Sequence, residues 1–125
     1  MNHTERISHS IEKLEANLSQ TARVEDWAEL MGYECPKNFA HRFMQYYSIR
    51  PVHILKFIRL KSITQKLRKN STSNFEIARQ HGIPNEIALN KFINYHIGCS
   101  PSEVKRMPDD QLAEKLEKFG SKIRQ

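Results

Sequence analysis

Glycine, cysteine and long apolar runs are all scarce in this sequence of 125 residues. The four glycines form no phosphate-loop pattern, which argues against a nucleotide-binding protein. Cys35 and Cys99 have neither CxxC nor Cys/His ligand spacing, which favours a reducing cytoplasm over a disulfide or zinc framework. No stretch approaches the ~18 consecutive apolar residues of a membrane helix, and residues 1–10 lack the apolar segment of a secretion signal. We therefore expect a cytoplasmic protein with no cofactor, no metal site and no membrane association.

Catalytic signatures are absent too. The chain has no HExxH or GxSxG pattern and no paired carboxylates beside a candidate pocket. His81 precedes a glycine and is expected to pack or cap rather than to bind a metal. The sequence therefore predicts that the protein is not an enzyme and has no catalytic residues.

Acidic residues are missing from residues 51–70, where six basic side chains give a local charge of +6, equal to the formal net charge of the whole chain. A strongly basic balance indicates an anionic partner. Ile54, Ile58, Ile63 and Leu67 recur at three- to five-residue steps, which predicts a helix roughly 25 Å long at 1.5 Å per residue. We expect this basic helix to contact phosphates and to connect two other parts of the chain.

Those two parts are similar to each other. Residues 27–51 align with residues 77–101 at a constant offset of 50 and without a gap. The identical pairs are Ala28 with Ala78, Gly32 with Gly82, and Pro51 with Pro101. Two copies are too few for a solenoid, so the pattern favours a pair of small modules joined by the basic helix. The predicted organisation is a first module in residues 1–50, a linker in 51–70, a second module in 71–107 and a tail in 108–125.

The first module has the pattern of a helix-turn-helix. An amphipathic helix is predicted over residues 6–19, a short helix from Val24 is ended by Gly32, and a further helix runs from Pro36 to about Tyr47. In this last helix, Phe39, Phe43 and Tyr46 are predicted to face inward. The polar side chains on the outer face are Lys37, Asn38, His41 and Gln45. In a helix-turn-helix, such an outer face enters the major groove of DNA.

The second module repeats this order. Asn74 is predicted to cap a helix that Gly82 ends, and a second helix starts near Asn85. Its inner residues are Leu89, Ile93 and Ile97, and its outer residues are Ile87, Asn90, Lys91 and Asn94. The residues expected in the two cores are Trp27, Phe39, Phe43, Ile77, Leu89 and Ile93. In the tail, Asp109 or Asp110 is a candidate cap for an amphipathic stripe of Leu112, Leu116, Phe119 and Ile123. The sequence leaves open whether this tail docks on the domain, binds a partner or frays.

These residues resemble the DNA-binding domain of the AraC/XylS family of bacterial transcription regulators. The matching positions are Phe39, His41, Phe43, Ser48 and Pro51 in the first module, Arg59 and Leu60 in the linker, and Ile77, Ala78, Gly82, Ile83, Gly98 and Pro101 in the second. The family positions of His41 and Lys91 carry arginine, and neither residue here can form the bidentate fork that arginine makes with guanine.

The resemblance implies an all-α fold of about seven helices, with two helix-turn-helix subdomains joined by a central linker helix, plus the helical tail. It also implies a transcription regulator, similar to the short stand-alone MarA/SoxS-like regulators or a fragment of a longer one. Such a protein binds double-stranded DNA as a monomer, reads successive major grooves and contacts RNA polymerase. The family implies activation, and no residue excludes repression.

The predicted DNA contacts fall into two sets. The base-reading candidates are Lys37, Asn38, His41, Gln45, Glu86, Ile87, Asn90 and Lys91, and the phosphate-binding candidates are Arg42, Lys56, Arg59 and Asn94. Glu86 either accepts a hydrogen bond from cytosine N4 or is an ordinary acidic residue favoured by a helix N-terminus. The alternative function is a protein-interaction or adaptor module on a helix-turn-helix scaffold whose DNA reading has weakened.

Overall fold

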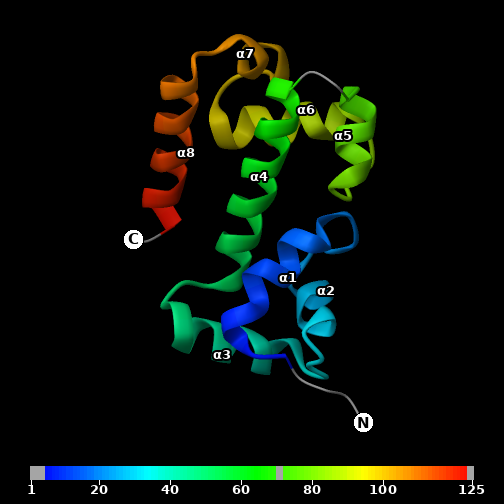
Figure 1. The fold of residues 1–125 in the computed structure, drawn as a ribbon, viewed down its shortest axis with the longest axis vertical. Helices are drawn as coiled ribbons and strands as arrows, with labels where there is room; N and C mark the ends of the chain where they lie inside the picture. The colour runs from blue at the N-terminus through cyan, green and yellow to red at the C-terminus, as the bar shows by residue number, and fades with distance from the viewer. Residues whose placement is uncertain (1–4, 70–71, 124–125) are drawn as a thin grey trace.

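The computed structural model describes residues 5–69 and 72–123, which form helices and no strand. The helices, in chain order, are η1 (Ile7–His9), α1 (Ser10–Ala16), η2 (Leu18–Gln20), α2 (Val24–Leu30), α3 (Pro36–Tyr47), α4 (Pro51–Lys69), α5 (Asn74–Gln80), α6 (Glu86–Ile97), α7 (Pro101–Arg106) and α8 (Asp109–Ile123). Figure 1 shows α4 as the central rod, with α1 to α3 around one end and α5 to α7 around the other. None of the helices in the described ranges is long and apolar enough to cross a bilayer.

The first helix differs from the prediction. One helix was expected over residues 6–19, but η1, α1 and η2 form three short helical segments there. The break lies at Asn17, whose φ of −134° is not helical. Its side-chain amide donates to the carbonyl of Lys13 (2.9 Å), and its own carbonyl accepts from the hydroxyl of Thr21 (2.6 Å). Asparagine side chains compete with helical hydrogen bonds in this way, and apolar spacing alone does not report it.

Aromatic side chains form the centre of the first core. Trp27 is fully buried, and its ring lies edge-on to Phe39 and Phe43, with ring centroids 5.2 and 5.0 Å away. The indole nitrogen donates to the carbonyl of Ser10 (3.0 Å), so the buried donor is satisfied. The expectation that Tyr46 faces inward was wrong, because its side chain is 60% exposed. Tyr47 packs on Phe43 instead, with ring centroids 4.5 Å apart.

Helix α4 turns different faces to two separate cores. Leu55 belongs to the first cluster of buried residues, whereas Leu60, Ile63 and Leu67 belong to the second. At about 100° per residue, Leu60 lies about 140° around the helix from Leu55. The linker helix predicted from the spacing of Ile54, Ile58, Ile63 and Leu67 is confirmed, and these residues divide between the two cores. Asn70, the last residue of the predicted linker, lies outside the described residues.

The second helix-turn-helix follows the prediction closely, apart from its first cap. Ser73 rather than Asn74 caps α5, since its hydroxyl accepts from the main-chain nitrogen of Glu76 (3.2 Å). The next helix, α6, starts beside Asn85 as expected, and Asn85 caps it by accepting from the nitrogen of Ala88 (2.8 Å). Buried Ile77, Ala78, Leu89, Ile93, Ile97 and Val104 fill the core of this half.

The tail docks on the domain. Leu112 is buried, and Leu116 and Phe119 pack against the second core; the side chain of Ile123 lies outside those described. The ring of Phe119 stacks on Phe57 of α4 with centroids 6.1 Å apart. Asp109 does not cap the helix through a described bond but pairs with Arg68 of α4. Figure 1 shows α8 running alongside α4.

Candidate nucleic-acid interface

The predicted base-reading residues of the first module all lie on the exposed side of α3. Lys37, His41 and Gln45 are spaced by four residues and form one solvent-facing stripe, opposite buried Phe39 and Phe43. Pro36 occupies the first helical position, where its missing N–H costs no hydrogen bond. Exposed Asn38 and Arg42 flank the stripe and, with His41 and Tyr33, line a surface hollow of about 470 Å³. The five predicted contact residues of this helix are therefore brought together on one surface.

The second module presents an equivalent stripe on α6. Ile87, Lys91 and Tyr95 are exposed and again lie four residues apart, at positions that correspond to Lys37, His41 and Gln45 by the offset of 50. The side chain of Ile87 is 69% exposed and that of Tyr95 is 85% exposed, although burying such large apolar groups would stabilise the folded protein. The sequence analysis missed Tyr95, and its equivalence to Gln45 in the repeat is the signal that identifies it.

The remaining predicted residues of α6 are also exposed. Asn90 and Asn94 flank the stripe, and the amide of Asn94 donates to the main-chain carbonyl of Asn90 (2.9 Å). Glu86 is the first residue of the helix and forms no ion pair with the described part of the chain. A carboxylate at this position is stabilised by the helix dipole, which favours the structural alternative for Glu86.

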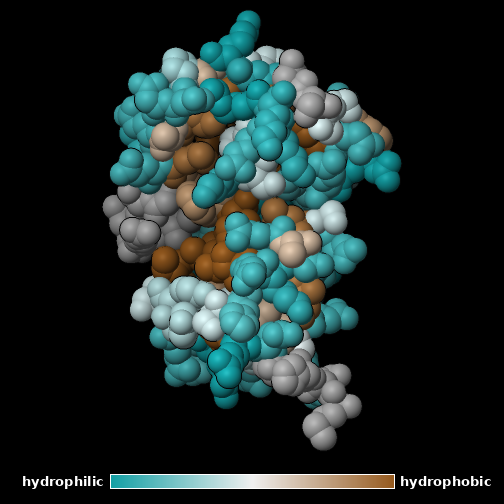
Figure 2. All heavy atoms as spheres, in the orientation of Figure 1, coloured by the Kyte–Doolittle hydropathy of each residue, from teal (hydrophilic) through white to brown (hydrophobic). Residues whose placement is uncertain are grey.

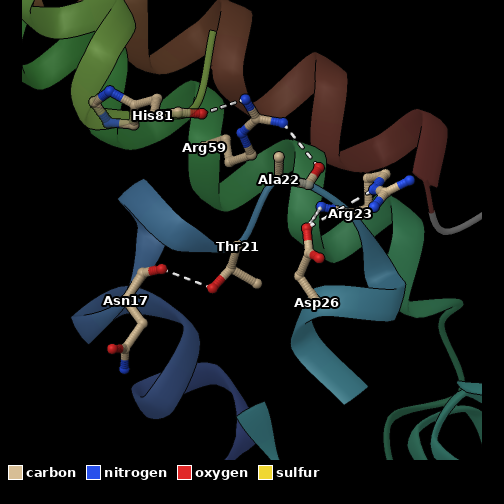
Figure 3. A network of polar contacts seen from close by, with 7 residues as sticks. All are labelled: Asn17, Thr21, Ala22, Arg23, Asp26, Arg59 and His81. Atoms are coloured by element: carbon tan, nitrogen blue, oxygen red, sulfur yellow. Dashed lines mark hydrogen bonds and ion pairs between the residues drawn. The ribbon is translucent and has the colours of Figure 1, made fainter. Parts of the chain in front are cut away.

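Arg59 was expected to bind a phosphate, but its guanidinium is already engaged. One terminal nitrogen donates to the carbonyl of Ala22 (3.1 Å), and the other donates to the carbonyl of His81. Figure 3 shows Arg59 between these two carbonyls, one from each half of the molecule. The guanidinium also lies 5.8 Å from the centroid of the Phe92 ring. Burial lowers the pKa of Arg59, yet arginine stays charged at neutral pH. Its position fits a bridge between subdomains, and the phosphate role does not fit.

Two further cations of α4 bond to the protein itself. Lys66 donates to the side-chain oxygen of Gln80 (2.7 Å). Arg68 donates to the main-chain carbonyls of Val104 and Met107 and pairs with Asp109. The basic residues of the linker therefore hold α4 against its neighbours as well as providing positive charge at the surface.

Two of the cations left exposed on α4, Lys56 and Lys61, face different directions. Lys56 is close enough to His96 of α6 to lower the pKa of that imidazole, together with the larger effect of burial. Lys61 lies about 140° around the helix from Lys56 and borders a hollow of about 460 Å³ between α1 and α4. The apolar residues that line this hollow are Ile11, Leu18, Ile54, Phe57 and Ile58. Figure 2 shows apolar residues gathered at mid-height on the face it views. Of Lys56 and Lys61, Lys56 is the one that lies near α6.

His81 packs inside the protein, as predicted. It is fully buried, with Nδ1 2.7 Å from the carbonyl of Ile77 and Nε2 2.8 Å from the hydroxyl of Ser62. Because a carbonyl can only accept, Nδ1 carries a proton and donates to Ile77; in the neutral imidazole, Nε2 then accepts from the hydroxyl of Ser62. Burial and the nearby charges of Lys66 and Arg59 lower the pKa of His81. Within the described residues, no three His, Cys, Asp or Glu side chains cluster in a way that could hold a metal ion.

Three solved structures share this architecture. The DNA-binding domain of AdpA, a global transcriptional factor solved in complex with a target DNA, is 20% identical over 82% of this chain and 92% of that chain, with a TM-score of 0.67. The C-terminal domain of AraT, a response regulator from Geobacillus stearothermophilus, is 20% identical over 82% and 88%, with a TM-score of 0.68. A transcriptional regulator from Chromobacterium violaceum with an AraC-type DNA-binding domain is 21% identical over 80% and 88%, with a TM-score of 0.65. This chain has the fold of an AraC-type DNA-binding domain.

The AraC-type fold confirms the predicted all-α class and the resemblance drawn from the sequence. No family model and no curated protein matches the chain. The likeness therefore lies in the arrangement of the helices, because only about 20% of the aligned residues are identical. In this fold, α3 and α6 are the second helices of the two helix-turn-helix units, and they carry the two exposed stripes.

Proposed function

We propose that this chain binds double-stranded DNA and regulates transcription, with α3 and α6 each inserted in a major groove. The observation that carries the proposal is the pair of equivalent exposed stripes, Lys37–His41–Gln45 and Ile87–Lys91–Tyr95, at opposite ends of α4. An α4 of 19 residues spans roughly 28 Å at 1.5 Å per residue, close to the ~34 Å of one DNA turn. The solved complex of AdpA with its target DNA supports the same partner here.

Each stripe has side chains suited to base edges. Lys37 and Lys91 can donate to guanine O6 or N7, and Gln45 and Asn90 can pair with adenine. Ile87 offers an apolar contact to a thymine methyl group, and the Tyr95 hydroxyl can bond to a base or a phosphate. Arg42, Lys56 and Asn94 lie beside the stripes and are proposed to hold phosphates.

One chain contains both recognition helices, so we propose that it binds as a monomer in the cytoplasm. The two buried clusters support a division into subdomains 1–50 and 71–107, joined by the linker 51–70 and followed by the tail 108–125. Contact with RNA polymerase would convert DNA binding into activation. Nothing in the proposal requires catalysis.

Selection of bound sequences from a random duplex library tests the base-reading assignment. The expected site has two conserved half-sites about 10 base pairs apart, the spacing of successive major grooves. Lys37→Ala should relax preference in one half-site and Lys91→Ala in the other, each by about 1–3 kcal/mol at the contacted base pair. If both variants altered the same half-site, or neither did, the assignment of one helix to each groove would fail.

The hollow between α1 and α4 favours a protein-interaction module as the second candidate. Its apolar lining is half-buried and contains no residue of α3 or α6. Ile58→Glu should therefore abolish regulation while leaving duplex affinity unchanged if a partner protein docks there. Unchanged regulation by Ile58→Glu would remove this candidate.

A further inference from the structure

A hollow lies beside α3, next to the exposed stripe of Lys37, His41 and Gln45. It measures about 630 Å³ and is bounded by the N-terminal segment on one side and by α3 on the other. Arg6 reaches it from the N-terminal segment, and Arg42, Gln45 and Tyr46 reach it from α3. Two arginines that are 36 positions apart in the chain thus line one space.

Neither arginine is neutralised inside the protein. Both side chains are exposed, and the ion pairs of residues 5–69 and 72–123 include neither Arg6 nor Arg42. Glu5 also borders the hollow, but its carboxylate lies 3.3 Å from the ammonium of Lys13. The space therefore keeps a positive balance and an unused set of guanidinium donors, which match phosphate oxygens.

The N-terminal segment is held in place where it forms this wall. The main-chain nitrogen of Glu5 donates to the carbonyl of Met31 (2.9 Å), and the hydroxyl of Tyr47 lies 3.4 Å from the carbonyl of Ile7. These bonds fix the main chain on both sides of Arg6 against the first helix-turn-helix. Arg6 is consequently positioned relative to α3 before any ligand arrives.

The position of the hollow indicates which ligand it takes. Gln45 belongs both to the stripe and to the hollow, and Arg42 lies about 60° around the helix from it. A helix 10–12 Å across fills a major groove of about 12 Å, so side chains on its flank meet the sugar-phosphate backbone. We propose that Arg6 and Arg42 jointly hold one backbone phosphate of DNA at the edge of the groove that α3 enters.

The second module lacks this site. By the offset of 50, Arg42 corresponds to Phe92, which is half-buried beneath the guanidinium of Arg59. A phosphate site made of two arginines is therefore confined to the first subdomain. The inference rests on the proposed DNA function, but it concerns residues that base reading does not require.

The experiment measures duplex affinity against salt for the parent, Arg6→Ala, Arg42→Ala, the double variant and the control Lys118→Ala. Lys118 is an exposed lysine of α8 that pairs with Glu114, so the control removes one positive charge elsewhere. Each arginine variant should flatten the plot of log affinity against log salt by up to about 0.9, and equally for two unrelated duplexes. Because the two arginines share a phosphate, the double variant should lose less than the product of the two single losses.

Three results would overturn the inference. Slopes for Arg6→Ala and Arg42→Ala that match Lys118→Ala would show that neither arginine meets a phosphate. Independent losses that multiply in the double variant would place the arginines at separate phosphates. A parent that binds no duplex would remove the proposed function as well, whereas the first two results leave that function standing.

Discussion

Arg59 donates a hydrogen bond to the main-chain carbonyl of Ala22, 37 residues earlier in the chain, across 3.1 Å. Its second terminal nitrogen reaches the carbonyl of His81, 22 residues later. A single side chain of the linker thereby connects the loop before α2 to the end of α5, as Figure 3 shows. The planar guanidinium holds its two terminal nitrogens in a fixed fork, so each nitrogen reaches its own acceptor.

Arg59→Met should lower the free energy of unfolding by about 2 kcal/mol, because two carbonyls lose charge-assisted hydrogen bonds. Lys56→Met is the matched control, since Lys56 is exposed on the same helix and should change stability by less than about 0.5 kcal/mol. Urea unfolding followed by circular dichroism measures both. Equal stability of the two variants would refute the bridging role of Arg59.

The buried imidazole of His81 should make stability depend on pH. Burial, followed by smaller effects of Lys66 and Arg59, lowers the pKa of His81 in the folded protein below its ordinary value of 6.5. Below pH 6.5 the unfolded chain therefore takes up a proton that the folded chain resists, so the free energy of unfolding falls as the pH drops. Above pH 6.5 the neutral His81 costs no stability, and its contribution to the free energy of unfolding is fully present. The urea midpoint should be lower at pH 5 than at pH 7.5.

His81→Gln should reduce this pH dependence, although His96, whose pKa burial and Lys56 also lower, leaves part of it. A pH dependence that survives His81→Gln in full would assign the effect to other groups.

Ser48 and Gly98 end α3 and α6 in the same left-handed conformation. Their φ values are 60° and 84°, and they correspond by the offset of 50. A side chain at this conformation costs about 1 kcal/mol relative to glycine, and no atom lies within 4 Å of a Cβ built at Gly98. Ser48→Gly should raise the free energy of unfolding by about 0.5–1 kcal/mol, and Gly98→Ser should lower it by a similar amount. Shifts of the same sign in these reciprocal variants would contradict this explanation.

Much of the fold could be predicted from the sequence because both helix-turn-helix units carry local signals. Apolar spacing, Gly32 and Pro36 predicted α2 and α3 at their observed bounds, and the ungapped repeat transferred the pattern to α5 and α6. The break at Asn17 was missed because it depends on side-chain bonds to the main chain within an otherwise helical pattern.

The candidate interface was predictable in part for the same reason. Outer positions of α3 and α6 follow from helical geometry, and all of the residues chosen on these helices are exposed. The role of Arg59 could not be predicted, because its acceptors are main-chain carbonyls that any residue would present. Because every residue has a main-chain carbonyl, the sequence does not distinguish an arginine that bonds to such carbonyls from one that faces solvent.

Fluorescence-anisotropy binding to duplex DNA across a salt series tests the DNA-binding proposal most directly, with Lys56→Ala and Lys61→Ala beside the parent. If Arg42 together with Arg6 neutralises one phosphate and Lys56 neutralises a second, log affinity should fall with log salt at a slope of about −1.8 or steeper. Lys56→Ala should flatten that slope by about 0.9, whereas Lys61→Ala, on another side of the same helix, should leave it unchanged. No binding at about 50 mM salt would contradict the proposal, as would equal effects of the two lysine variants.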